Sequence, residues 1–253
     1  MPLDIVQHML PTTSQWLEWS TRHPGWDELT TRTSDAILIT GKDNTMKTSL
    51  LFQAAVSYAA EGCHVTFVSH QPFSCLPRTV HGMPRPNPAI MKHLKMLYLT
   101  SYDDLIGYLT TMHQGTMVPS VIVIDDLHLF LHSDNCQESH QQQTVARLCA
   151  LLVDTAQYLR PTSDATSAVL VSIQNTSITD PVLTTIQRFF KTTWHIHRTD
   201  DSLLGPNTNE YILQTTRNMS AITDTCQLLL TFTSDRAEIR LKQIQVEDVS
   251  DRS

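Results

Sequence analysis

The stretch that decides how this chain folds is AILITGKDNTMKTSL, residues 36–50. A short apolar run ends at Gly41, and Lys47 and Thr48 follow at the spacing of a phosphate-binding loop, whose pattern is G-x-x-x-x-G-K-[ST]. The second glycine of that pattern is absent, because Met46 occupies its position. The stretch predicts a strand, a phosphate-binding loop and a helix, with one substitution that weakens phosphate binding.

Apolar runs alternate with helical patterns after Ala36, which is typical of β-α-β units in an α/β fold. The segment SVIVIDD, residues 120–126, predicts a central strand that is buried on both faces. The other expected strands cover residues 36–40, 64–69, 94–100, 168–174, 193–197, 210–214, 226–232 and 237–241. The expected helices cover residues 47–61, 102–113 and 138–159, and one more begins at Asp180-Pro181. We therefore predict a mostly parallel central sheet with helices on both faces.

The length of 253 residues suits one such domain with short extensions. We expect an N-terminal extension over residues 1–35, the α/β domain over 36–241 and a polar C-terminal tail over 242–253. In the extension, the spacing of Ile5, Met9, Trp16 and Trp19 suggests a short amphipathic helix, which packs either on this domain or on a partner.

The charge and composition exclude some classes of protein. A net charge of -7 and a pI near 5.9 argue against a protein whose whole surface binds nucleic acid, but they allow a local basic patch. No apolar segment approaches the roughly 18 residues needed to cross a bilayer, and the N-terminus lacks the features of a signal peptide. Five cysteines without a CxxC pair are typical of reduced thiols. We expect a soluble protein that is not exported.

The phosphate loop predicts which residues bind a nucleotide. Backbone N–H groups at a helix N-terminus point at the phosphates, the lysine adds positive charge and the hydroxyl of Thr48 holds Mg²⁺. A side chain at Met46 costs on the order of 1–2 kcal/mol, or roughly tenfold in affinity, because glycine adopts the required backbone conformation more easily. The expected nucleotide-binding residues of the loop are Gly41, Lys42, Asp43, Asn44, Thr45, Met46, Lys47 and Thr48.

The rest of a nucleotide site is expected at the ends of other strands. Asp125 ends the most apolar strand and is the predicted second Mg²⁺ residue, although a turn acid that caps the next segment gives the same pattern. Gln71 and His70 follow the strand 64–69, where hydrolysis needs a group that positions water. A neutral glutamine accepts a proton poorly, so turnover should be slow. Gln174 either senses the terminal phosphate or makes a strand-end hydrogen bond.

Two clusters of basic residues are candidates for contact with single-stranded DNA. The second cluster interleaves with Phe189, Phe190 and Trp194, which serve either as stacking faces or as core residues, and the core interpretation is favoured. The first cluster contains Arg78, Arg85, Lys92 and Lys95; the second contains Arg188, Lys191, His195, His197 and Arg198.

Two further patterns suggest functional sites, but a purely structural explanation is favoured for each. His128, His132, Cys136 and His140 recur every four residues, as zinc ligands on one helix would, but Ser133-Asp134-Asn135 predicts a break in that helix. Phe52 and Ala55 match a docking signature of RecA-like recombinases, but their place in the helix after the phosphate loop favours a core role.

These motifs together resemble the RecA-like recombinase paralogues and, within them, the small SWIM-domain-associated ATPases of Shu-type complexes. The resemblance covers residues 36–241. Beyond the two nucleotide motifs it includes LLFQAAVSYAAEG, TFVSHQPFSCLPR, LLVDTAQYL, IQRFF followed by TW, and LLLTFTSDRAEI. It implies ATP and Mg²⁺ as cofactors, a SWIM-domain zinc protein and recombinases as partners, and a nuclear location. It also implies a role in assembling or stabilising recombinase filaments on single-stranded DNA.

Two hypotheses of function follow. In the first, the chain is a degenerate ATPase of a recombination-mediator complex, in which Lys47, Asp125 and Gln71 support slow hydrolysis. In the second, it is a pseudo-ATPase scaffold that binds only protein partners and tolerates Met46 because no nucleotide binds. A phosphate-loop kinase for a small molecule is a third alternative, but the sequence has no recognisable lid or substrate-binding signature.

Overall fold

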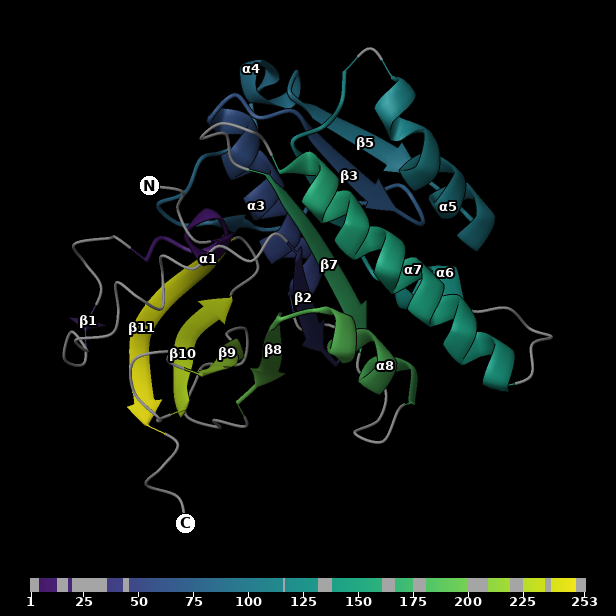
Figure 1. Ribbon diagram of the computed structural model, residues 1–253. Helices are drawn as coiled ribbons and strands as arrows, with labels where there is room; N and C mark the ends of the chain where they lie inside the picture. The colour runs from purple at the N-terminus through teal and green to yellow at the C-terminus, as the bar shows by residue number, and fades with distance from the viewer. Residues whose placement is uncertain are drawn as a thin grey trace.

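The computed structural model describes residues 5–12, 18–19, 36–42, 46–115, 117–131, 138–160, 167–174, 181–199, 209–218, 225–234 and 238–248. In this part of the chain an 11-stranded sheet runs in the order β1-β11-β10-β9-β8-β2-β7-β6-β3-β5, and β4 pairs with β11 beside this path. Helices cover both faces of the sheet (Figure 1).

The strands from β8 to β5 in this order pair in parallel and form the predicted centre of the sheet. Their central members consist mostly of apolar residues, because both faces of these strands are buried. The bounds of these strands are β2 Ala36–Gly41, β3 Val65–Ser69, β5 Leu94–Tyr98, β6 Val121–Ile124, β7 Ala168–Gln174 and β8 Thr192–Arg198.

The remaining long strands form an antiparallel extension of the sheet beyond β8. They are β9 Asn209–Asn218, β10 Thr225–Ser234 and β11 Glu238–Asp248, and the short strands β1 Glu18–Trp19 and β4 Thr79–Val80 both pair in parallel with β11. Strand β11 is longer than the sequence pattern predicted, because its pairing with β10 continues past Leu241 to Asp248.

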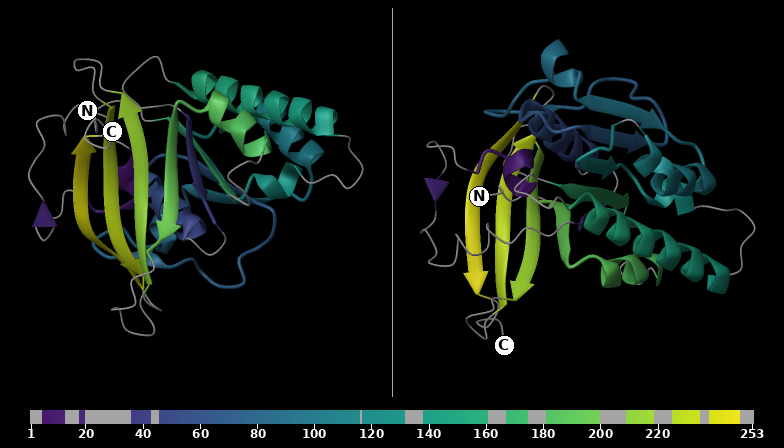
Figure 2. Two further views of the ribbon diagram at one scale, coloured as in Figure 1. Left: turned by 90° about the horizontal axis from the view of Figure 1, so that it is seen from below. Right: turned by 45° about the horizontal axis from the view of Figure 1, so that its top comes forward.

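Two hydrophobic cores lie on opposite faces of the sheet. Alternate residues of each strand enter opposite cores, so Ile37 and Ile39 contact the core beneath α3, whereas Leu38 belongs to the core beneath α7. Figure 2 shows α7 and α8 together over one face. The helices are α1 Ile5–Met9, α3 Lys47–Ala60, α4 Pro88–Met91, α5 Tyr102–Thr111, α6 His128–Leu131, α7 Glu138–Leu159 and α8 Pro181–Phe189, with the 3-10 helix η1 at Met112–Gln114. In the described residues, no helix is both long and apolar enough to cross a membrane.

The N-terminal helix is shorter than predicted. Helix α1 ends at Met9, two residues before Pro11, because a proline disfavours helical conformation in the residue that precedes it. Trp19 lies in β1 rather than in a helix, and Trp16 and Trp26 are outside the described residues. Met9 is fully buried in the core that contains α3. Among the two interpretations of the helix, packing on its own domain is therefore confirmed.

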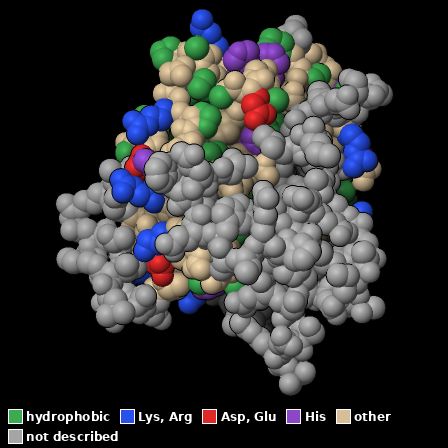
Figure 3. All heavy atoms as spheres, turned by 90° about the vertical axis from the view of Figure 1, so that its left-hand side faces the viewer, with side chains coloured by type: hydrophobic (Ala, Val, Ile, Leu, Met, Phe, Trp, Pro, Cys, Tyr) green, Lys and Arg blue, Asp and Glu red, His purple; other side chains and the backbone are tan. Residues whose placement is uncertain are grey.

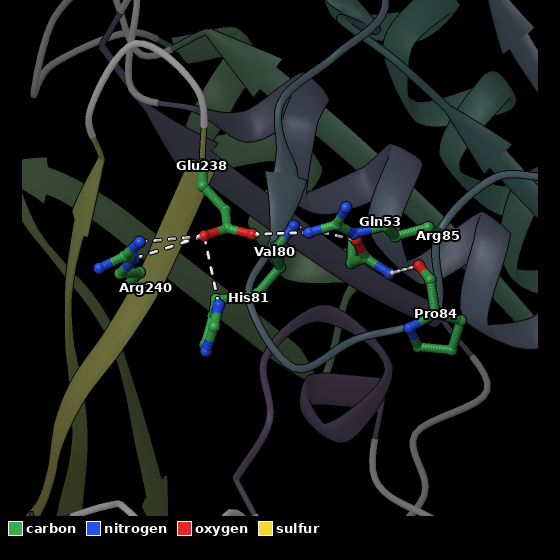
Figure 4. Close-up of polar contacts among 7 residues, drawn as sticks. All are labelled: Gln53, Val80, His81, Pro84, Arg85, Glu238 and Arg240. Atoms are coloured by element: carbon green, nitrogen blue, oxygen red, sulfur yellow. Dashed lines mark hydrogen bonds and ion pairs between the residues drawn. The ribbon is translucent and has the colours of Figure 1, made fainter.

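The proline-rich loop, residues 72–88, is tied to α3 by a buried glutamine (Figure 4). The Gln53 side chain is 2% exposed; its Oε1 accepts from the Val80 N–H at 3.2 Å, and its Nε2 donates to the Pro84 carbonyl at 3.0 Å. These bonds satisfy polar groups that α3 would otherwise bury without partners. They fix the path of the chain between β3 and β5.

The same loop is tied to β11 by Glu238 (Figure 4). The Glu238 carboxylate lies 3.2 Å from His81 Nδ1, 3.3 Å from Arg85 Nη2 and 3.4 Å from Arg240 Nη2. The three partner side chains are mostly exposed, so solvent screens these ion pairs and each contributes little to stability. The loop is therefore held mainly by the buried bonds of Gln53 and by the backbone pairing of β4 with β11.

We expect Gln53→Leu to lower the free energy of unfolding by about 1–3 kcal/mol, because the buried Val80 N–H loses its acceptor. Urea denaturation measures this change. Arg85→Ala is the matched control in the same loop, and it should cost less than about 1 kcal/mol because Arg85 is 75% exposed. Equal losses for the two variants would contradict the importance of Gln53.

Candidate nucleotide site

The carboxyl ends of four parallel strands bring the predicted site residues to one edge of the sheet. Gly41 at the end of β2 is in register with Gln174 at the end of β7. Asp125 follows β6, and its N–H donates to the Val68 carbonyl of β3 at 2.9 Å. This edge is where ligands bind in open α/β sheets. Lys47 and Thr48 reach it as the first residues of α3, directly after the loop.

Lys47 closes the loop between strand and helix. Its side chain is buried, and Nζ donates to the carbonyls of Gly41 at 3.2 Å and of Lys42 at 2.9 Å. These bonds hold the ammonium across the loop at the N-terminus of α3, where the helix dipole favours an anion. Asp43, Asn44 and Thr45 are outside the described residues.

Met46 adopts the backbone conformation that its place in the motif requires. Its φ is 66° and its ψ is 10°, in the left-handed region that favours glycine. The methionine therefore accepts a strain of about 1–2 kcal/mol instead of changing the path of the loop. Its side chain packs against the core beneath α3, and its sulfur contacts Arg78 and Ser234.

Thr48 and Asp125, the predicted Mg²⁺ residues, are in direct contact. Thr48 Oγ1 donates to Asp125 Oδ2 at 2.8 Å, and Ser172 Oγ donates to Asp125 Oδ1 at 2.9 Å. Hydroxyl and carboxylate oxygens are the ligands that Mg²⁺ prefers, so the residues present fit this ion. Asp126 turns the chain after the strand, with a φ of 54°, and its N–H donates to Ser172 Oγ at 2.8 Å.

Ser172 is a residue of the site that sequence reasoning missed. It lies inside β7 and is fully buried. The available signal was a single hydroxyl within the apolar run AVLVSIQ, because a buried polar side chain in a central strand needs a partner. The partner belongs to the neighbouring strand, and the register that brings them together is not visible in the sequence.

Burial raises the pKa of Asp125 to about 6, and the negative charge of Asp126 adds to the increase. The hydrogen bonds from Thr48 and Ser172 and the charge of Lys47 act in the opposite direction. A carboxyl with this pKa is ionised at neutral pH but retains a proton in mildly acidic solution. A cation beside it would favour the ionised form.

The residues expected to position water are less organised. Gln71 is exposed. Its backbone carbonyl accepts a hydrogen bond from Ser69 Oγ at 3.0 Å. His70 Nε2 lies 3.2 Å from the Thr100 carbonyl, and its ring packs edge-on against Phe130. Gln174 is half-buried beside Gly41, and both interpretations of its role stay open.

Several residues that the sequence suggested for docking or for stacking on DNA lie in the hydrophobic core instead. Phe52, Ala55, Phe190 and Trp194 are buried, so none of them offers a free stacking or docking face. On the face shown in Figure 3, Lys and Arg side chains lie in separate groups and form no continuous basic surface over the described residues. Arg78 of the first basic cluster reaches the phosphate loop instead.

The proposed zinc stripe is not continuous over the described helices. Helix α6 ends at Leu131 and α7 begins at Glu138. His132, Cys136 and the side chain of His140 lie outside the part of the chain that the structure describes. Among the residues whose side chains are placed, no group of three or more metal-ligating side chains is found.

The pKa of Asp125 predicts how stability depends on pH. As pH rises from about 4 to about 6, folded protein retains a proton that the unfolded chain has released, so the free energy of unfolding falls. With an unfolded pKa of about 3.9, the loss is about 3 kcal/mol at pH 7. In Asp125→Asn, the free energy of unfolding should lack this pH-dependent fall when it is measured by urea denaturation across pH 4–7 without added nucleotide. A constant difference between the variant and the original protein at every pH would refute the assignment.

Comparison with known proteins agrees with this geometry. No family model matches the chain. A solved structure of flagellar accessory protein FlaH from Methanocaldococcus jannaschii covers 84% of this chain and 88% of its own, with a TM-score of 0.51 and 14% identity. At this identity the likeness concerns the fold alone, and it confirms the predicted RecA-like α/β class.

Two curated proteins named ATPase SWSAP1 match the sequence. The mouse protein is 28% identical over an alignment of 166 residues; the match covers 61% of this chain and 55% of that protein, so it spans little more than half of the length of the mouse protein. The human protein is 30% identical over an alignment of 162 residues, and the match covers 61% of this chain and 68% of that protein. The extent of the human match shows that this chain belongs to the family of the ATPase SWSAP1.

Proposed function

We propose that this chain is the ATP-binding subunit of a homologous-recombination mediator complex and hydrolyses ATP slowly. The single observation that carries the nucleotide part is the 2.8 Å hydrogen bond from Thr48 to Asp125, which joins the loop helix to the end of β6. A structural loop has no need of a buried carboxylate beside its helix N-terminus, because desolvation of that group lowers stability. The name ATPase borne by both relatives supports the same assignment.

Each residue of the site has a distinct role in this proposal. Lys47, already held across the loop, contributes positive charge to the β- and γ-phosphates. Thr48 and Asp125 hold Mg²⁺, which neutralises phosphate charge when it is bound. Gln71 is exposed and neutral, so it orients water without accepting its proton well. Slow turnover follows from that last feature.

The cellular part of the proposal rests on the resemblance and on membership of the family. We propose a SWIM-domain zinc protein as the direct partner, and recombinases with their paralogues as further partners. In this role the complex assembles or stabilises recombinase filaments on single-stranded DNA in the nucleus. Of the aromatic residues near the second basic cluster, Phe190 and Trp194 are buried and Phe189 is half-buried against the core, so we expect any contact of that cluster with DNA to be mainly electrostatic.

A pseudo-ATPase scaffold is the second candidate, and the presence of a strained methionine in place of the second glycine favours it. A strained residue in a phosphate loop is tolerated without consequence if the loop binds nothing. Under this alternative, the fold serves only to present surfaces to partner proteins.

Calorimetric titration of Mg²⁺-ATP should show saturable binding that Lys47→Ala weakens at least about tenfold, because the buried ammonium loses its contact with the phosphates. Lys95→Ala, an exposed lysine on β5, is the matched control and should bind as the original protein does. No binding up to millimolar ATP by a folded protein would instead support the scaffold.

Capture of the SWIM-domain zinc protein tests the partner independently. Lys47→Ala should still capture it under the scaffold alternative, with or without ATP. Under the ATPase proposal, added ATP should change the amount captured by the original protein and leave that captured by Lys47→Ala unchanged. Failure of both proteins to bind this partner would overturn the cellular assignment and leave the nucleotide site untouched.

A further inference from the structure

The sulfur of Met46 is held by two polar side chains that come from distant parts of the chain. Arg78 Nη1, in the proline-rich loop, lies 3.5 Å from Met46 Sδ, and Ser234 Oγ, at the end of β10, lies 3.6 Å from it. The same two groups bind each other, since Arg78 Nη1 donates to Ser234 Oγ at 2.7 Å. The phosphate loop, the end of β10 and the proline-rich loop therefore meet at the Met46 side chain.

From this contact we infer that Arg78 and Ser234 are positioning residues for the phosphate loop, which hold Met46 in the left-handed conformation that glycine would adopt unaided. The inference rests on the proposed nucleotide function. It names the residues that allow a loop without its second glycine to keep the geometry that phosphate binding requires.

Both positioning residues are themselves fixed. The Arg78 N–H donates to Ser49 Oγ at 3.2 Å, which places the arginine over the first turn of α3. Ser234 is fully buried at the end of a strand that pairs on both sides. Groups that are already ordered lose little entropy when they hold a neighbour, so a small interaction energy is enough to bias the loop.

The donors and acceptors of Met46, Arg78 and Ser234 are compatible with the contacts among these three side chains. The Ser234 hydroxyl accepts from the guanidinium and has one proton to donate, which points to the sulfur. A thioether is a weak acceptor, so each contact alone is slight. Packing of the methionine against the core adds dispersion contacts that glycine would lack.

A second role for Arg78 gives a different prediction. A guanidinium over the first turn of α3 could act on the nucleotide directly, without Met46 as intermediary. A double-mutant cycle separates the two roles, because a residue that acts through Met46 loses its effect once Met46 is replaced, whereas a direct contact keeps it.

The experiment measures the Kd for Mg²⁺-ATP by calorimetry in the original protein, Ser234→Ala, Met46→Gly and the double variant. We expect Ser234→Ala to weaken binding about 3- to 10-fold when Met46 is present and less than about twofold when glycine replaces it. Met46→Gly alone should bind as tightly as the original protein or up to about tenfold more tightly. Arg78→Ala, tested in the same cycle, should follow the pattern of Ser234→Ala.

Arg85→Ala is the control, since Arg85 lies in the same proline-rich loop but pairs with Glu238 away from Met46. It should leave the Kd unchanged in both backgrounds. Equal losses for Ser234→Ala and Arg78→Ala in both backgrounds, or no loss in either, would overturn the inference.

A second cycle without ATP keeps this result distinct from failure of the proposed function. Denaturant midpoints of the same four proteins should show that Ser234→Ala shifts the transition more with Met46 than with glycine. If this coupling is present but no variant binds ATP, the proposed nucleotide function fails and with it the positioning role. If ATP binds through Lys47 but neither cycle shows coupling, the nucleotide function stands and the positioning role is wrong.

Discussion

Burial of the parallel strands between two layers of helices decides where polar chemistry can lie in this protein. Inside the buried strands, backbone groups pair with neighbouring strands and most side chains are apolar, so a buried charged group is favoured only where such a strand ends. Asp125 occupies such an end, and two hydroxyls satisfy its oxygens. Thr48 reaches the same carboxylate from the opposite direction, because α3 begins directly above the edge of the sheet.

A second constraint joins this edge to the antiparallel strands. The proline-rich loop leaves β3 beside the site, pairs with β11 through β4 at Thr79–Val80 and is bonded to Gln53 of α3 at Val80 and Pro84. Arg78 projects from that loop toward the phosphate loop, and Ser234 comes from β10. The antiparallel extension is therefore part of the environment of the site and not a separate appendage.

The candidate site departs from the phosphate-loop motif at Met46 and matches it at Lys47 and Thr48. Lys47 is held by backbone carbonyls of the loop, and Thr48 is bonded to Asp125, as the proposed binding of phosphate and magnesium needs, whereas Met46 keeps the loop geometry at an energetic cost. In the proposed role, contacts of the methionine sulfur reduce that cost, and the exposed Gln71 is expected to limit hydrolysis more than binding. These features are the ones expected of the proposed subunit, in which a bound nucleotide would regulate contacts with partners more than it would supply chemical turnover.

The sequence by itself determined the local elements and the most specific motif. Apolar runs and helix signals located the strands around Ala36 and Val121, and the spacing of the phosphate-loop motif identified Met46 as a residue in a position that normally requires glycine. Only the tertiary structure decided that Ser172 and Ser234 belong to the site, because their partners are distant in the chain and no local pattern encodes strand register. It also decided that β11 continues past Leu241, since pairing with β10 overrides the polar character of that segment.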